Sequence, residues 1–283
     1  MAPRRTIAAC FAILALLGAG CGEFPDGASA IEGPQAAGAT PSPSTSPAPS
    51  PREFLEVGEQ AASHDAGEPA GATVPAPKSL ERWGWALRSK TDALDVYTDP
   101  RGGASLRMSI DAQNPWDQRI AFPIRAVRIL GGEAWYRVLL GLEPNGSNGW
   151  VRGDDVTFDR TRHRVVIDLS ERVLRHYRNG KLRHRFSVGI GAPETPTTPG
   201  HFFVWAHLDP RDASGPYGTY LLGLSGFSRV LTNWPGGGRM AIHGTADPTD
   251  PGRRVSYGCA RVYNPQMNEL QGIPMGTTVL IHR

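Results

Sequence analysis

The stretch from residue 22 to about residue 78 limits the fold more than any other feature, because its composition cannot build a core. It is rich in Pro, Ala, Gly, Ser and Thr, and prolines recur between Pro41 and Pro51. Such a stretch buries too little apolar surface to offset the entropy lost on ordering. Prolines favour an extended, semi-stiff spacer instead. We therefore expect a disordered tether over residues 21–79 and globular structure from about Leu80 onward.

The first twenty residues have the features of an export signal. Arg4 and Arg5 precede an apolar run from Ile7 to Leu17, which is too short for a permanent membrane-spanning helix. Small residues follow and lead directly into Cys21. This order predicts a secretory signal peptide over residues 1–20. The residues before Cys21 resemble a bacterial lipobox, which implies lipidation of Cys21 and a membrane anchor outside the cell. The alternative is ordinary cleavage, with Cys21 incidental.

Charge and cysteine content narrow the functional classes. The chain carries 30 Lys and Arg against 27 Asp and Glu, and no long basic run, so nucleic acid binding has no electrostatic support. Of the three cysteines, Cys10 lies inside the apolar core of the signal. Loss of the signal and lipidation of Cys21 would leave Cys259 as the sole thiol. Exported proteins commonly pair their cysteines, so Cys259 is kept either for its chemistry or as a buried structural residue.

Residues 80–158 carry the signals of a small β-barrel. Short strands are predicted over Ala93–Tyr97, Ile120–Ile129 and Ala134–Leu139, and Asn145-Gly146 is a turn dipeptide. The last part of this segment resembles the final strands of bacterial SH3-like domains. Such a domain could bind wall peptide or glycan, or it could be a rigid spacer that packs on the next domain.

Residues 162–283 predict a second, mainly β domain. Val165, Ile167 and Leu169 fall at every second position, and the turn dipeptide Asn179-Gly180 separates them from a second alternating run. The only predicted helix is short and covers Pro265–Leu270. The glycines at 236–238 precede no Lys-Ser/Thr, so a phosphate-binding loop is not supported. We expect no cofactor.

The chemistry of the chain is concentrated between His243 and Cys259. A free thiol has a pKa of about 8.5, so only a few per cent is thiolate at neutral pH, and a neighbouring imidazole can take its proton. Three apolar residues precede His243, which predicts that it ends a strand. Gly258 directly before the thiol leaves room for a substrate and permits a strained backbone. The backbone N–H groups of Gly258 and Cys259 could then form an oxyanion hole.

This segment resembles the catalytic domain of the L,D-transpeptidase (YkuD-like) family, and the likeness covers residues 162–283. The matching motif residues are His243, Gly244, Ser256, Gly258, Cys259, Arg261 and Asn264. The upstream segment "VVIDLSERVLRHYRNGKL" is also similar to family sequences. The resemblance implies a nucleophilic Cys259, a proton-transferring His243 and a backbone oxyanion donor at Gly258. It further implies peptidoglycan stem peptides as substrates and carbapenem β-lactams as inhibitors.

One motif position departs from the family, because Tyr257 stands where the family has a second histidine before Gly-Cys. Tyrosine titrates near 10 and cannot act as a base at neutral pH. Three functions therefore stay open: an active transpeptidase, an L,D-carboxypeptidase that uses water as acceptor, and a non-catalytic wall-binding or scaffold protein.

The remaining candidate residues have alternative interpretations. Tyr217 and Gly218 border the substrate groove or form a simple turn, while Arg261 and Asn264 contact substrate or hold the loop after the cysteine. Ser256 lacks the Gly-x-Ser-x-Gly setting of a nucleophile, so its hydroxyl is expected to support the loop. A zinc site at the cysteine would need more ligands at suitable spacing, so we expect no metal.

Overall fold

The computed structural model describes residues 84–101, 104–210, 212–231 and 237–283. Within these residues the chain is nearly all β, which confirms the predicted mainly-β fold class. None of the described helices has the length and apolar character that a membrane span requires. The predicted signal peptide, the lipidation residue Cys21 and the tether over residues 21–79 lie outside the described residues.

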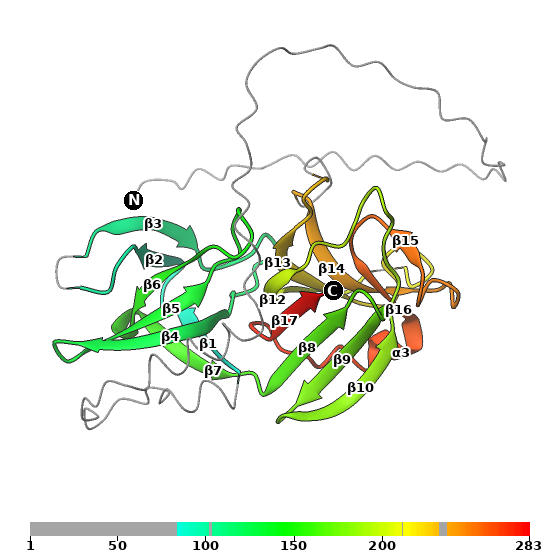
Figure 1. The fold of residues 1–283 in the computed structure, drawn as a ribbon. Coiled ribbons are helices and arrows are strands. Elements are labelled where there is room, and N and C mark those ends of the chain that lie inside the picture. The colour runs from blue at the N-terminus through cyan, green and yellow to red at the C-terminus, as the bar shows by residue number, and fades with distance from the viewer. Residues whose placement is uncertain (1–83, 102–103, 211, 232–236) are drawn as a thin grey trace, which may run out of the picture. The chain divides into compact units, whose positions relative to one another are not determined.

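Seven strands form the first sheet, in the order β3-β2-β6-β5-β4-β1-β7 (Figure 1). Their bounds are β1 Trp85–Ser89, β2 Ala93–Tyr97, β3 Leu106–Asp111, β4 Phe122–Leu130, β5 Glu133–Leu139, β6 Asn148–Arg152 and β7 Val156–Arg160. The 3-10 helix η1 (Gly153–Asp155) lies between β6 and β7. Alternating residues point inward, so Leu94 and Val96 of β2 are buried and their neighbours are not. Neighbouring strands are antiparallel throughout.

Eight strands form the second sheet, in the order β10-β9-β8-β17-β12-β13-β14-β16. Their bounds are β8 His163–Asp168, β9 Val173–Arg178, β10 Lys181–Ser187, β12 Gly200–Leu208, β13 Leu221–Phe227, β14 Arg239–Thr245, β16 Ala260–Tyr263 and β17 Thr278–His282. The predicted turn between β9 and β10 has Asn179 and Gly180 at φ 53° and 73°, as a type I′ hairpin requires. The short helix predicted over Pro265–Leu270 is present as α3, Asn264–Asn268.

A small parallel ladder completes the fold and positions the motif segment. Strands β11 (Ile190–Gly191) and β15 (Arg254–Ser256) pair with each other, and the chain then passes through residues 257–259 into β16. Strand β16 runs parallel to β14, with His243 opposite Arg261. The motif histidine therefore stands on one strand, and the motif cysteine directly precedes the neighbouring strand.

Candidate active site

The loop that carries Cys259 is closed by the Ser256 hydroxyl. Ser256 is buried at the end of β15, and its Oγ donates to the Cys259 carbonyl at 2.6 Å. The same oxygen accepts the Gly258 N–H at 3.2 Å. Gly258 has φ 109°, which few residues other than glycine adopt. The Gly258 N–H would have to leave Ser256 before it could bind an oxyanion.

The Cys259 thiol is unpaired and partly exposed. Burial raises its pKa, whereas the Ala241 backbone N–H and the Arg261 charge act in the opposite direction. Because the pKa is raised above the ordinary thiol value, Cys259 is protonated at neutral pH and needs a base to become a nucleophile.

His243 is buried on β14, with 3% of its surface exposed, and its Nδ1 lies 2.8 Å from the Gly244 carbonyl. A carbonyl only accepts, so this contact assigns the proton to Nδ1 and leaves Nε2 with a lone pair. The pKa of His243 is lowered to about 4, mainly by burial and also by the Arg261 charge, while the Gly244 hydrogen bond and the Asp250 charge act in the opposite direction. His243 is therefore neutral at pH 7 and able to accept a proton.

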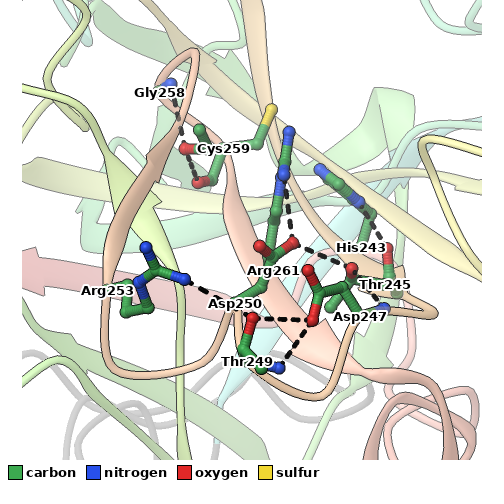
Figure 2. Close-up of polar contacts among 11 residues, drawn as sticks. His243, Thr245, Asp247, Thr249, Asp250, Arg253, Gly258, Cys259 and Arg261 are labelled. Carbon is green, nitrogen blue, oxygen red and sulfur yellow. Dashed lines mark hydrogen bonds and ion pairs between the residues drawn. The ribbon is translucent and has the colours of Figure 1, made fainter.

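Arg261 lies opposite His243 in the ladder between β14 and β16, and an acidic partner that the sequence did not reveal fixes its guanidinium. Its Nη1 donates to Asp250 Oδ2 at 3.0 Å, and Thr245 Oγ1 donates to the same oxygen at 2.9 Å. Figure 2 shows the Cys259 sulfur, the Arg261 guanidinium and the His243 ring gathered at one place. Asp250 stands five residues after Thr245 in a Pro-rich turn, and neither position has a distinctive sequence signal.

Asn264 locks a second loop onto the strand that carries His243. Its Oδ1 accepts the Thr219 N–H at 3.1 Å, and its Nδ2 donates to the Ala213 carbonyl at 3.0 Å. A Cβ on Gly218 would meet this Oδ1 at 2.2 Å, and one on Gly244 would meet it at 2.3 Å. Both glycines are therefore needed for the close approach of Asn264 to the two backbones.

Two tyrosines stand beside the catalytic candidates. The Tyr217 ring meets the His243 ring edge to face at 5.3 Å, so the loop locked by Asn264 covers the imidazole. Tyr257, the residue that departs from the family motif, has 59% of its surface exposed. The structure thus brings Tyr217 and Gly218 to the site on one loop, and Tyr257 to it on another.

A second histidine group lies on strands β8, β9 and β10. His163 Nδ1 is 3.0 Å from His176 Nε2, and the His176 and His184 rings stack in nearly parallel planes at 5.4 Å. His176 is 4% exposed, and burial together with its histidine neighbours lowers its pKa to about 4. Across the described residues, no three His, Cys, Asp or Glu side chains are placed to hold a metal ion.

The second domain matches known proteins in sequence. Residues 162–281 match the YkuD model, described as an L,D-transpeptidase catalytic domain. The YkuD protein of Bacillus licheniformis is 33% identical over 124 residues, which cover 44% of this chain and 67% of that protein. The YkuD protein of Bacillus subtilis is 30% identical over 122 residues, covering 43% and 66%.

Solved structures also match over part of the chain. The crystal structure of Enterococcus faecium L,D-transpeptidase is 24% identical, with a TM-score of 0.35, and the match covers 43% of this chain and 50% of that one. An L,D-transpeptidase from Mycobacterium smegmatis matches over 53% and 91%, at 14% identity and a TM-score of 0.34.

The family-model match and the Bacillus relatives, together with the motif residues, define a chain with an L,D-transpeptidase catalytic domain. The chain belongs to the YkuD-like L,D-transpeptidase family. It spans about two thirds of the length of its Bacillus relatives and half of the Enterococcus protein.

Proposed function

We propose that this protein is a peptidoglycan L,D-transpeptidase that cross-links stem peptides through a thioester on Cys259. The observation that carries the proposal is the placement of a neutral buried imidazole, a thiol and a fixed guanidinium on two neighbouring parallel strands. A base next to a thiol is the arrangement that nucleophilic acyl transfer needs.

The first half-reaction releases D-alanine. Cys259 Sγ attacks the carbonyl between the diamino acid at stem position three and the terminal D-alanine, while His243 Nε2 takes the thiol proton. A carbon–sulfur bond forms, the carbon–nitrogen bond breaks, and the proton passes from His243 to the departing amine. The thiol pKa is raised and the pKa of His243 is about 4, so a resting thiolate–imidazolium pair is unfavourable. Proton transfer therefore accompanies the attack.

Arg261 supplies the positive charge that the neutral imidazole lacks. Its charge favours the Cys259 thiolate and disfavours a protonated His243. The Asp250 carboxylate and the Thr245 hydroxyl hold the guanidinium in place. Arg261 thus stabilises negative charge on sulfur as it develops, and it pushes the proton from His243 toward the leaving amine.

The second half-reaction forms the cross-link. The amine of a second stem attacks the thioester, a new amide forms between two position-three residues, and the amine proton returns through His243 to the thiol. The Cys259 N–H lies next to the reacting sulfur and serves as an oxyanion donor. The Gly258 N–H joins it when Ser256 releases that group.

In the same proposal residues 80–158 form an SH3-like domain, and Cys21 is lipidated, so that the tether holds the enzyme at the membrane facing the wall. Fractionation of cells that express the Cys21→Ser variant tests the lipid anchor. Without the anchor, the protein should move from the membrane fraction to the soluble exported fraction. A wild-type protein already in the soluble fraction would contradict it.

The central experiment incubates the purified chain with a disaccharide tetrapeptide and follows the products by mass spectrometry. We expect loss of D-alanine and formation of dimers, and neither product from Cys259→Ala. A carbapenem should add its mass to the wild type at Cys259 only. Hydrolysed tripeptide without dimers would identify a carboxypeptidase instead, and an inert wild type would identify a scaffold.

A further inference from the structure

A pocket of about 420 Å³ lies between the first sheet and strands β12 to β14 of the second. The aromatic side chains of Trp116, Trp205 and Phe227 line it, and Asp111, Gln113 and Arg239 add polar groups. Concave sites of this size, mostly apolar with a few polar groups, are typical of ligand-binding sites. The reaction described above uses none of these residues.

Trp116 is exposed, yet the loop that carries it is fixed. The Trp116 N–H donates to Asn114 Oδ1 at 3.1 Å, and Asn114 Nδ2 donates to the Trp205 carbonyl at 3.1 Å. Gln118 binds the His207 backbone twice, through Nε2 to the carbonyl at 2.6 Å and through Oε1 from the N–H at 3.0 Å. Trp116 keeps 47% of its surface exposed. Because its loop is already fixed, binding of a ligand would cost little further conformational entropy.

The inner wall of the pocket is equally fixed. The Arg239 guanidinium lies 3.7 Å from the centre of the Trp205 ring and 4.3 Å from that of Phe227, and its Nη2 donates to the Gly141 carbonyl at 2.8 Å. Burial lowers the pKa of Arg239 to about 10, so the group stays charged at neutral pH. A rigid aromatic wall with a stacked cation suits a polar ligand that has one apolar face.

The pocket lies on the same face of β14 as the candidate base. Met240 and Ile242 point into the core of the second domain, so Arg239 and His243 point to the opposite face. The two residues are four positions apart on one strand, which at the usual rise is about 13 Å. Arg239 in the pocket and His243 in the candidate site therefore lie on one face of the same strand.

We propose that this pocket binds the sugar ring that carries the stem peptide of the substrate, an inference that rests on the proposed function. A pyranose has an apolar C–H face that stacks on an indole, and hydroxyl and amide groups that bind side chains such as those of Asp111 and Gln113. Three stem residues between the sugar and the scissile bond span about 10 Å when extended. This length matches the separation of Arg239 from His243.

Binding without turnover is the first test. The Cys259→Ala chain is titrated with the peptide-free disaccharide N-acetylglucosaminyl-N-acetylmuramic acid, and Trp fluorescence and calorimetry report binding. Trp116→Ala in the same background should weaken the disaccharide affinity about tenfold, the scale for loss of one aromatic anchor. Leu130→Ala, which removes another exposed apolar side chain of the first sheet outside the pocket, should leave it unchanged. No binding by the parent, or equal binding by the Trp116 variant, overturns the proposal.

Turnover is the second test, and it separates failure of the pocket from failure of the enzyme. Trp116→Ala should lower kcat/KM for the disaccharide tetrapeptide about tenfold, mainly through KM. Turnover of the sugar-free tetrapeptide and acylation by a carbapenem should not change. An equal loss on all three compounds would mean that Trp116 only supports the fold, which overturns the proposal. A wild type that turns over neither peptide refutes the proposed function, while the binding test still decides the pocket.

Discussion

Two buried histidines of this protein, His243 and His176, have similar pKa values but different neighbours. Burial lowers both pKa values to about 4, and both side chains are almost fully enclosed. His243 has Nδ1 bound to a backbone carbonyl, a thiol nearby and a guanidinium fixed by Asp250. His176 has other histidines as neighbours, and its Nδ1 has no hydrogen-bond partner among the described residues.

The comparison teaches that a lowered pKa does not identify a catalytic histidine. Burial produces the shift at both places, and burial alone performs no reaction. What distinguishes the candidate site is a fixed tautomer on β14 and a thiol directly before the neighbouring strand β16. The following predictions test that distinction from its strongest consequence to its weakest.

The largest expected effect separates the two histidines directly. His243→Gln should lower D-alanine release and carbapenem acylation about 1,000-fold, since it removes the base. His176→Gln should change either rate less than about threefold, because that side chain lies on β9 and not on β14. Steady-state release and intact-mass kinetics measure both. Similar losses in the two variants would refute the distinction.

Arg261 tests whether the fixed cation matters as much as the base. Arg261→Gln should lower acylation about 100-fold at neutral pH, a typical effect of removing one preorganised electrostatic group. Because the Arg261 charge lowers the thiol pKa, the variant should need a higher pH to reach its maximal rate. Arg261→Lys should recover part of the rate. Removing Arg261 alone leaves the buried Asp250 carboxylate unpaired, so the double variant Arg261→Gln, Asp250→Asn is the control. An unshifted pH–rate profile of Arg261→Gln would argue against a role of Arg261 in stabilising the thiolate.

The stacked histidine should instead affect stability at acid pH. His176 has a folded pKa of about 4, below the unfolded value of about 6.5, so the unfolded state gains a proton first as the pH falls. This one group should lower the free energy of unfolding by about 2 kcal/mol between pH 7 and pH 5. Urea unfolding at both pH values should show a smaller pH-dependent loss for His176→Gln than for wild type. Equal losses would mean that His176 titrates normally.

Tyr257 should have the smallest effect and tests whether the site needs a second imidazole. The residue is largely exposed, and His243 can take the thiol proton alone. Tyr257→Phe should therefore keep acylation within about threefold of wild type, and Tyr257→His should change it only modestly. A loss of 10-fold or more in Tyr257→Phe would assign the hydroxyl to substrate or oxyanion binding. An inert wild type beside an active histidine variant would favour the scaffold interpretation.

Local sequence signals predicted much of the fold. The turn at Asn179-Gly180 needs left-handed backbone at both positions, which those residues adopt readily, and the structure has it. The strands predicted over Ala93–Tyr97 and Ala134–Leu139 are present, the second as Glu133–Leu139, and burial alternates along the first. The strand predicted from Ile120 begins instead at Phe122, because Ile120 bonds back to Ala112.

The candidate site was only partly visible in the sequence. The family motif pointed to His243 and Cys259 together, because both stand in one short segment. The role of Asp250 could not be predicted, because it depends on an ion pair with Arg261, which reaches it from strand β16. The Trp116 pocket likewise joins residues from two sheets that are about a hundred positions apart in the chain. Contacts of this kind depend on topology, which periodicity does not determine.

The position of β17 affects the order in which the second sheet can form. This strand lies inside the second sheet, between β8 and β12, and pairs in parallel with residues more than a hundred positions earlier. Contacts of such high sequence separation slow folding. The half-sheet β8–β10 and the half-sheet that holds His243 therefore join only after β17 has been synthesised. Until then their unpaired edges are open to aggregation.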